Sequence, residues 1–529
     1  MTTTKQHFNY DEAPYPDLSY TQTHPDRLAM LGKLLGMSPV PIEQCRVLEI
    51  GTAGGANLLP LAAVLPNSTF VGIDLSKVQI DQANVAREAS GMTNITFHQM
   101  DIMDITPEFG QFDYIIAHGI YSWVPPVVQE KLLDVCKTNL SPQGIVYMSY
   151  NCYPGWHTMD IIRNIMLYRS RDAATPQEKS AEARQWISFM ADALKNQPES
   201  AYAAVFQNYL NMRATQSEEF DHAALLHDEL EVNNQPLYFY QFMEHAQQHG
   251  LQYLAESDFP TVMPYGLSDE VMEHLGEIAH DTIEMEQYMD FLRNRSFRRT
   301  LLCHAEVDVN RALSTEPVFE FSVSSIAHTV KVDADKAAKG IETFEGTDGA
   351  QFSTDHPLTK AAFHYLLDVK PQRIPFIQLA RQAAASRNMT QVINQDAGVM
   401  AANLLHAFTY SLSLIQFHTF IPPMSMVVSE RPLATTYARF QARHFPNIGN
   451  LTHGRVQLDN FSRLVLAQLD GQTNHAALLD FLVELVETGK ISSPSIRSEP
   501  KSLEELRKML GEQLEVTLQE FAELGLLMA

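Results

Sequence analysis

The first 150 residues alternate between short apolar runs and longer segments whose apolar residues recur every three or four positions. Five apolar runs predict strands: 46–50, 70–74, 95–98, 112–117 and 144–149. Three amphipathic segments between them predict helices: 57–65, 76–90 and 127–139. The runs show little internal alternation, which is typical of strands buried on both faces of a parallel sheet. The pattern therefore predicts a Rossmann-like α/β domain.

The remainder of the chain has a predominantly helical pattern. A helix is expected from Pro25 to Gly36, and long helices are expected within residues 157–215. Residues 224–310 continue mostly helical. The last third opens with a strand-like run at 318–323 and then shows helix–turn–helix units, which suggests winged-helix-like modules in an α+β region.

The length of 529 residues predicts three or four domains. The expected divisions are a core with an N-terminal lid, a helical region that could mediate homodimer formation, a helical middle region and a C-terminal α+β region. Their predicted bounds are 1–165, 166–222, 223–312 and 313–529. The arm before the core could cover a bound cofactor, or could pack on the domain for stability alone.

A glycine-rich turn after the first strand is the clearest sign of a cofactor site. Gly51 and Gly55 allow a sharp turn and close backbone approach, and the helix that begins near Asn57 directs free N–H groups at a ligand. The spacing departs from the G-x-G-x-x-G fingerprint of dinucleotide-binding proteins. Glu49, two positions before the first glycine, is instead typical of methyltransferases that use S-adenosylmethionine (AdoMet) and release S-adenosylhomocysteine (AdoHcy).

The predicted carboxyl ends of the next strands carry side chains suited to the same cofactor. Asp74, followed by Leu75, stands where a carboxylate could accept hydrogen bonds from ribose hydroxyls. Asp101, followed by Ile102, could accept a hydrogen bond from an adenine amino group. His118 could line the methionine part of AdoMet or act as a general base. Since ligands of parallel sheets bind beyond the carboxyl strand ends, we expect these residues to share one site.

Aromatic and amide side chains follow the fourth and fifth strands and suggest where the methyl acceptor binds. Tyr121 and Trp123 could stabilise a cation with their rings, or could simply pack locally. Asn151 could hydrogen-bond an acceptor nitrogen, or could hold the turn before Pro154. Tyr15 in the N-terminal arm could reach the same centre. We therefore take these four residues as the catalytic candidates.

Composition and charge narrow the choice of partners. The formal net charge of −25 argues against a nucleic-acid partner. It is compatible with a basic protein segment as substrate, although acidic surfaces also serve solubility. The four cysteines form no C-x-x-C pair, so neither a disulfide framework nor a metal site is indicated. The sequence shows no signal peptide and no apolar run long enough for membrane insertion, which predicts a cytoplasmic protein.

Three arginines, Arg293, Arg295 and Arg298, cluster near the end of the predicted middle region. They could bind an anion or a substrate, or they could pair with neighbouring acids. Ion pairing with Asp290 within a partly buried helix is the favoured interpretation.

Several motifs together resemble one family of methyltransferases. They are Tyr10-Asp-Glu-Ala-Pro-Tyr15, Gln22-Thr-His-Pro25, Val47-Leu-Glu-Ile-Gly51, His118-Gly-Ile-Tyr-Ser-Trp-Val-Pro125, Tyr150-Asn151 and Pro154-Gly155-Trp156. The chain is similar to class I AdoMet-dependent enzymes with a methyltransferase regulatory domain, which include rickettsial-type lysine methyltransferases of outer-membrane proteins. The resemblance continues through Leu230–Glu256 and Gln287–His304, and more weakly through Leu458–Asn474.

The resemblance implies a core followed by dimerisation, middle and C-terminal regions, and a lysine acceptor. It also implies AdoMet binding by Glu49, Gly51, Gly55, Asp74, Asp101 and Ile102, with His118 beside the cofactor. Thr52 and Ala53 replace the more usual cysteine and glycine. The leading hypothesis is therefore an AdoMet-dependent N-methyltransferase acting on protein lysines. The alternatives are a small-molecule methyltransferase and a non-catalytic AdoMet-binding regulator.

Overall fold

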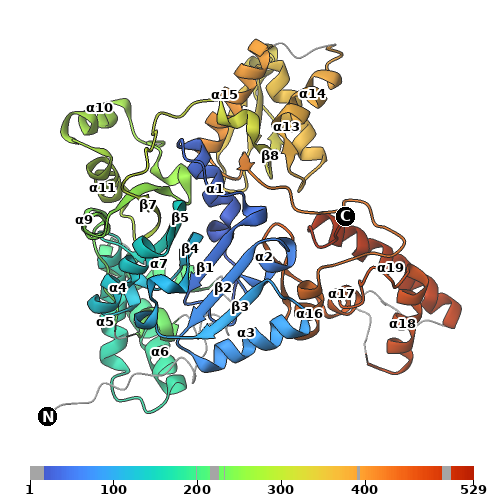
Figure 1. Cartoon of the computed structure of the whole chain (residues 1–529), viewed down its shortest axis with the longest axis horizontal. Helices are drawn as coiled ribbons and strands as arrows, with labels where there is room; N and C mark the ends of the chain where they lie inside the picture. Colours follow the sequence, from blue (N-terminus) through green and yellow to red (C-terminus); the bar gives the residue numbers. More distant parts are fainter. Residues whose placement is uncertain (1–16, 198, 215–224, 232, 390–393, 491–501) are drawn as a thin grey trace.

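One seven-stranded sheet forms the centre of the molecule, in the order β3-β2-β1-β4-β5-β7-β6 (Figure 1). The computed structural model describes residues 17–197, 199–214, 225–231, 233–389, 394–490 and 502–529. The five predicted strands are present and parallel: β1 (Arg46–Ile50), β2 (Thr69–Asp74), β3 (Ile95–Gln99), β4 (Phe112–Ala117) and β5 (Leu140–Asn151). The predicted Rossmann-like core is thus confirmed.

Helices cover both faces of this sheet because its strands are apolar on both sides. Val47 belongs to the core shared with one group of helices, whereas the next residue, Leu48, packs with the other group. The first group is α1 (Pro25–Leu34), α2 (Leu59–Val64) and α3 (Lys77–Ala89). The second is α4 (Pro126–Thr138) and α9 (Phe239–Gln248).

The middle region supplies two strands to the sheet, which the expectation of a mostly helical segment missed. β7 (Phe297–His304) pairs antiparallel with β5, and β6 (Leu251–Glu256) pairs antiparallel with β7. Since β7 covers the edge of the long strand β5, the core and the middle region share one sheet. The other elements of this region are α10 (Asp269–Ile278) and α11 (Thr282–Arg293).

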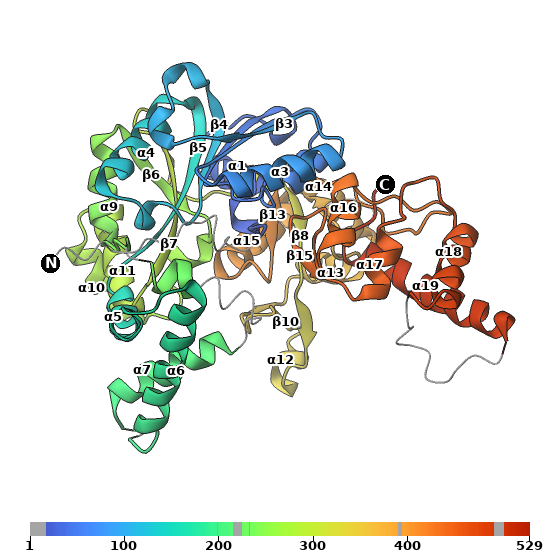
Figure 2. The same cartoon turned by 90° about the horizontal axis from the view of Figure 1, so that it is seen from below.

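Three helices project from the sheet as a separate unit with its own small core (Figure 2). They are α5 (Trp156–Arg169), α6 (Pro176–Leu194) and α7 (Ala201–Arg213). Thr175 and Glu178 form a capping box that fixes the start of α6. Trp186 and Phe189 on α6 stack on each other and are partly exposed.

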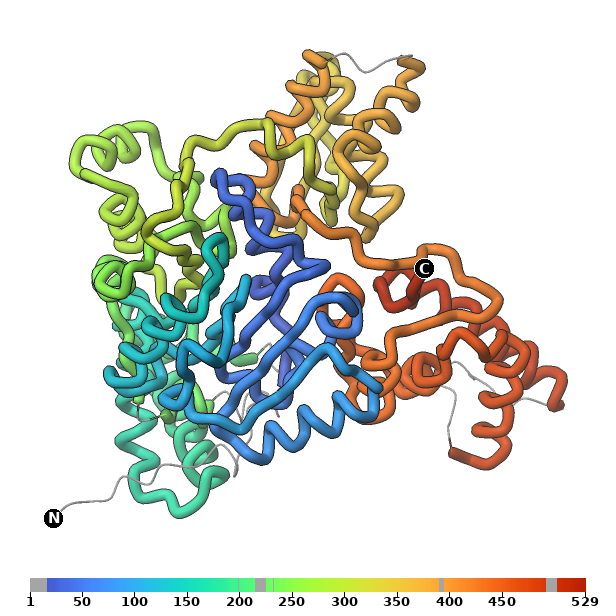
Figure 3. The backbone as a smooth tube through the Cα atoms, viewed as in Figure 1, coloured from blue at the N-terminus to red at the C-terminus, as the bar shows by residue number. Residues whose placement is uncertain are grey.

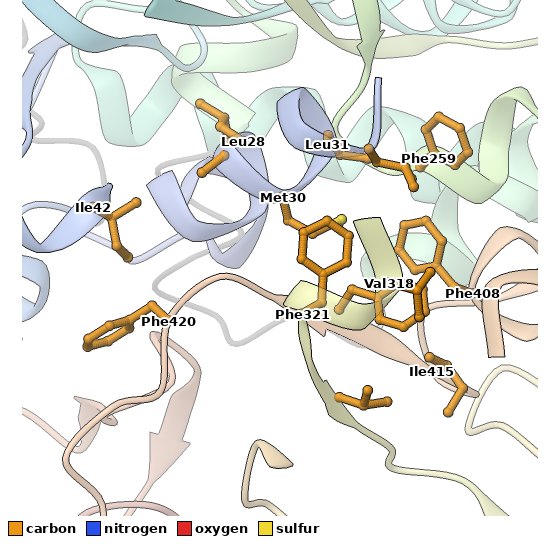
Figure 4. Packing of buried hydrophobic residues seen from close by; sticks show 14 of the residues in the cluster. Leu28, Met30, Leu31, Ile42, Phe259, Val318, Phe321, Phe408, Ile415 and Phe420 are labelled. Atoms are coloured by element: carbon orange, nitrogen blue, oxygen red, sulfur yellow. The ribbon is translucent and has the colours of Figure 1, made fainter. Parts of the chain in front are cut away.

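The next unit packs on α1 and extends the core of the sheet. Leu28, Met30 and Leu31 of α1 lie in the same cluster as Val318, Phe321 and Phe408 (Figure 4). Its helices are α12 (Ala334–Ala338), α13 (Pro357–Asp368), α14 (Phe376–Ser386) and α15 (Asn394–Tyr410). Its strands are β8 (Ser322–Ser324), β9 (His328–Val330), β10 (Glu342–Glu345), β11 (Gln351–Thr354), β12 (Ile374–Pro375) and β13 (Gln416–His418).

The C-terminal unit has a separate hydrophobic core, so the region expected over 313–529 contains two packed units. Its helices are α16 (Thr436–His444), α17 (Asn460–Leu466), α18 (His475–Glu487) and α19 (Leu503–Glu523), and its hairpin is β14 (Asn447–Gly449) with β15 (Arg455–Gln457). The chain crosses from the preceding unit and brings α16 beside α2 and α3 (Figure 3). Among the described residues, no helix is both long and apolar enough to cross a membrane.

Candidate functional site

The turn between β1 and α2 depends on backbone conformations that favour glycine. Gly51, Ala53 and Gly55 have φ angles of 75°, 49° and 83°. A Cβ atom on Gly51 would lie 2.2 Å from Ile120 Cδ1, and one on Gly55 would lie 2.6 Å from Phe97 Cζ. Conformation therefore favours glycine at both positions, and a larger residue would also displace the Ile120 or Phe97 side chain. Ala53 adopts the left-handed region at a cost of about 1 kcal/mol, so the turn keeps its shape with alanine there.

Asp74 lies at the end of β2 and holds this turn. Its Oδ2 accepts a hydrogen bond from the Ala53 N–H at 2.9 Å, and its Oδ1 accepts one from the Ser76 N–H at 2.9 Å. The carboxylate and the glycine-rich turn, separated in sequence, are thus adjacent, as the parallel-sheet argument predicts.

Glu49 is buried behind the turn and bonded to neutral groups. Its Oε1 accepts a hydrogen bond from Asn57 Nδ2 at 2.6 Å, and its Oε2 accepts one from the Thr52 hydroxyl at 2.9 Å. Burial raises the pKa of Glu49 to about 8, although these two bonds lower it. Thr52, one of the two departures from the usual turn sequence, therefore has a defined role as a donor to Glu49.

Asn57 connects this turn to the C-terminal unit. Its Oδ1 accepts hydrogen bonds from the Tyr20 N–H at 2.9 Å and from His453 Nε2 at 2.9 Å. His453 lies in the loop between β14 and β15, is 2% exposed, and makes an edge contact with the His24 ring. Burial lowers the pKa of His453 to about 3, so its imidazole is neutral. His453, which is 396 positions from Asn57 in the sequence, thus helps to orient the amide that donates to Glu49.

The arm before α1 lies against the turn. Asp17 Oδ1 accepts a hydrogen bond from the Ala56 N–H at 2.9 Å, and the Tyr20 ring lies 4.0 Å from the His118 ring. Burial raises the pKa of Asp17 to about 7, and the nearby charge of Asp74 adds to this. The candidate Tyr15 lies outside the described residues, so its predicted role stays a prediction.

His118 follows β4 and is held by two hydroxyl groups. Its Nδ1 lies 3.0 Å from the Tyr147 hydroxyl and 3.2 Å from the Ser149 hydroxyl. Burial, with the nearby charge of Arg299, lowers the pKa of His118 to about 3. The imidazole is therefore neutral and a weak base. This favours a role beside a ligand over general base catalysis.

The ends of β2 and β3 present a second part of the same edge. The Met100 N–H donates to the Asp74 carbonyl at 2.9 Å, so the two strand ends are adjacent. Leu75 is 66% exposed there, whereas Ile102 is buried. Asp101 caps the turn that follows β3 by accepting a hydrogen bond from the Met103 N–H at 3.0 Å. Leu75, with Asp74 and Asp101 on either side, offers an apolar surface for a flat heterocycle and carboxylates for a ribose.

Trp123 lies in the segment after β4, Asn151 is the last residue of β5, and Ser122 links the two. The Asn151 N–H donates to the Ser122 hydroxyl at 2.8 Å, and Asn151 Nδ2 donates to Asn234 Oδ1 at 3.0 Å. The Trp123 and Trp156 rings meet edge to face at 6.3 Å. Asn151 is thus held by Asn234 of the middle region as well as by the core.

Tyr121 takes a different position from the one expected of a residue that contacts substrate. Its ring is 1% exposed and packs against Tyr150 and Phe242. Its hydroxyl lies 2.6 Å from His245 Nδ1 on α9. The side chain is directed into the core under α9, so the alternative of local packing describes it and we no longer include it among the catalytic candidates.

Several residues near the carboxyl ends of the strands belong to the site although the sequence pattern did not single them out. Tyr147 and Ser149 alternate along β5 and both contact His118, which their period-2 spacing could have suggested. Asp17 and Tyr20 lay within an arm whose role was left open. His453 is brought in only by the packing of the C-terminal unit, and no pattern in its own segment indicates that contact.

Three family matches divide the chain in this order. Residues 42–216 match a methyltransferase domain family, residues 221–304 match the predicted methyltransferase regulatory domain, and residues 430–526 match the C-terminal winged helix domain of PKMT. The second match contains both strands that the regulatory region adds to the sheet.

Relatives cover the chain from end to end. It is 34% identical over 534 residues to Uncharacterized protein RP789 of Rickettsia prowazekii, covering 99% of this chain and 94% of that protein. It is also similar to the structure of PKMT2 from Rickettsia typhi in complex with AdoHcy, with a TM-score of 0.84 and 27% identity. That match covers 98% of this chain and 100% of the other.

Proposed function

Because this chain belongs to the family of AdoMet-dependent methyltransferases that carry a methyltransferase regulatory domain, we propose that it methylates lysine side chains of a protein. The observation that carries the proposal is the match to PKMT2, a protein lysine methyltransferase by name, across nearly the full length of both chains. The match includes the regulatory and C-terminal units as well as the core.

The residues at the sheet edge fit AdoMet in shape and charge. Gly51 and Gly55, both with positive φ angles, form a turn whose backbone a ligand can approach closely. Asp74 would hold the ribose, Asp101 the adenine amino group, and Leu75 and Ile102 the ring. Two further carboxyl groups lie at the turn, Glu49 buried and Asp17 bonded to the Ala56 N–H, and a cationic ligand there would stabilise their ionised forms.

These two raised pKa values make AdoMet affinity depend on pH. As the pH falls from 7.5 to 5.5, protonation of Asp17 and Glu49 should remove charge that a cationic ligand needs, so the Kd should rise by up to about ten-fold per pH unit for each carboxyl group. The folding stability of the free protein should change in the opposite direction. Because Asp17 and Glu49 have raised pKa values, the free protein should lose stability as the pH rises toward 7 or 8. Calorimetry in buffers of different ionisation enthalpy should detect proton release on binding. The Asp17→Asn variant should show a flatter profile, and a pH-independent Kd in the wild type would refute this assignment.

The chemistry needs alignment more than acid–base catalysis. When bound, AdoMet supplies a methyl group on a sulfonium, which an acceptor nitrogen displaces in line. A lysine amine has a pKa of about 10.4, so it must lose its proton before it can attack. His118, with a pKa of about 3, is too weak a base for that task. We assign to His118 the positioning of the cofactor, together with Tyr20, and to Trp123 and Asn151 the positioning of the acceptor.

Asn151 provides a direct test of acceptor positioning. We expect Asn151→Ala to lower kcat by about 100-fold, as the loss of one oriented polar group at a reacting centre typically does. AdoMet affinity should stay within two-fold, because Asn151 is assigned to the acceptor, and both constants can be measured with methyl-labelled AdoMet. Asn211→Ala, on exposed α7, is the matched control. An unchanged kcat would exclude Asn151 from the site.

His453 tests whether the C-terminal unit supports the cofactor site. We expect His453→Ala to raise the Kd for AdoMet by about five-fold, equivalent to the loss of one hydrogen bond of about 1 kcal/mol to Asn57. Thr452→Ala, a neighbour in the same loop, should leave the Kd unchanged. Equal affinities in His453→Ala and the wild type would show that Asn57 keeps its orientation without this contact.

The distribution of transferred label separates a protein acceptor from a small one. Incubation with methyl-labelled AdoMet and a cell extract should place most of the label in the acid-insoluble protein fraction. Label confined to the soluble fraction would instead favour a small molecule.

The homodimer expected through α6 and α7 has support from the exposed Trp186 and Phe189, whose stacked rings offer an apolar contact.

A further inference from the structure

A cluster of metal-ligating side chains lies between α4 and α9, away from the glycine-rich turn. Glu130 is on α4 and His245 is on α9. His249, four residues after His245, directly follows the last residue of α9 and continues the same face. The Nε2 atoms of the two imidazoles lie 3.2 and 2.9 Å from the two oxygens of the Glu130 carboxylate. The three ligand atoms all lie within 4.8 Å of one another.

The other nitrogen of each imidazole is held by a neighbouring group. His245 Nδ1 lies 2.6 Å from the Tyr121 hydroxyl, and His249 Nδ1 lies 2.8 Å from Asp134 Oδ1. Histidines that bind metals almost always have such a partner on the second nitrogen, which fixes the ring and directs the ligating nitrogen. Both rings are therefore oriented so that their Nε2 atoms converge on one point beside Glu130.

The two carboxylates beside His249 favour a bound cation. A carboxylate oxygen contacts each ring nitrogen of His249, from Glu130 on one side and Asp134 on the other. An imidazole that donates from Nδ1 to Asp134 has a lone pair on Nε2, which can coordinate a cation beside Glu130. Two imidazoles and a carboxylate are ligands that Zn²⁺ and similar divalent ions prefer over water alone.

We propose that Glu130, His245 and His249 bind a divalent transition-metal ion of the Zn²⁺ class. The cysteine spacing gave no sign of such a site, because its ligands are histidines and a carboxylate from separate regions. Magnesium and calcium are disfavoured, since they select oxygen ligands.

The ion would join the regulatory region to the methyltransferase core. α4 lies in the segment that matches the methyltransferase domain, and α9 lies in the segment that matches the regulatory domain. The two helices are neighbours in both views (Figures 1 and 2). Through Tyr121 the same cluster contacts the segment that follows His118. The ion is therefore structural, acting on the mutual position of the two regions.

Cobalt(II) absorption of the full-length, untagged and metal-free protein tests the site. Titration should give one bound Co²⁺ per chain with the visible absorption of a nitrogen- and oxygen-coordinated ion, displaced by Zn²⁺. Because Glu130 lies on the surface, Glu130→Gln should fold normally, and it should weaken binding by about 100-fold or more. Asp134→Asn, which removes only the partner of His249 Nδ1, should weaken it by about 10- to 100-fold.

His280→Gln is the matched control, because His280 forms an exposed pair with Glu284 on the protein surface. That variant should bind Co²⁺ as the wild type does. Absence of a stoichiometric Co²⁺ spectrum in the wild type would overturn the proposal, as would equal Co²⁺ affinities in the wild type and Glu130→Gln. A loss of binding in Glu130→Gln with full binding in His280→Gln would establish it.

Discussion

Replacing Asp74 with alanine should raise the Kd for AdoMet by at least about 100-fold, because charge-assisted hydrogen bonds contribute about 1.5–3 kcal/mol each. The variant loses the carboxylate assigned to the ribose hydroxyls. It also loses the oxygen that accepts the Ala53 N–H, so the turn becomes less well held. Isothermal calorimetry with AdoMet and AdoHcy measures both affinities.

Two variants separate the roles of Asp74. Asp74→Asn keeps one acceptor oxygen and should fall between the wild type and Asp74→Ala. Asp81→Ala, on α3, breaks only an exposed ion pair with Lys77 and should bind AdoMet normally. If Asp74→Ala retains wild-type affinity while folded, the assignment of the β2 end to the cofactor is wrong.

The second large effect is expected from Arg298→Ala, which should lower the free energy of unfolding. Arg298 is completely buried in β7, where it pairs with Glu256 on β6 and with Glu286 and Asp290 on α11. Burial alone would lower the pKa of Arg298, but these three acids raise it well above its ordinary value. Removing it by Arg298→Ala leaves three acids in the core without their shared partner. We expect a loss of about 3–5 kcal/mol, typical of breaking a buried ion pair.

Thermal unfolding measures this loss. The Tm of Arg298→Ala should fall by about 10 °C, given about 2–4 °C per kcal/mol for a domain of this size. Turnover should fall as well, since Arg298 pairs with Tyr150 in β5, directly before Asn151. Arg171→Ala removes an exposed arginine that contacts Tyr168 and Asp172, and it should leave the Tm unchanged. An unaltered Tm in Arg298→Ala would contradict the role given to this cluster.

Local sequence patterns were sufficient to predict the part of the site that lies at the carboxyl ends of the parallel strands. Asp74 and Asp101 could be placed because parallel strands bring their carboxyl ends together, whatever surrounds them. Ion pairing with Asp290 was also anticipated correctly for Arg295 and Arg298, whereas Arg293 donates to backbone carbonyls. The pairing nevertheless joins a strand to a helix and a second strand, and is not confined to one helix as expected.

Contacts that depend on long-range packing were not predictable from local patterns. β6 and β7 join the sheet by antiparallel pairing that begins at β5, so their role depends on an edge far away in sequence. His453 reaches Asn57 only because the C-terminal unit packs on α2 and α3. The direction of the Tyr121 side chain depends on α9, which lies more than a hundred residues further along the chain.

The central claim is that AdoMet held at the glycine-rich turn donates its methyl group to protein lysines. The most direct measurement is mass spectrometry of candidate acceptor proteins after incubation with methyl-labelled AdoMet and either the wild type or Asp74→Ala. We predict labelled methyl groups on lysine side chains with the wild type and none with Asp74→Ala. Labelled methyl groups found only on other residue types or on small molecules, with AdoHcy still released, would contradict the claim.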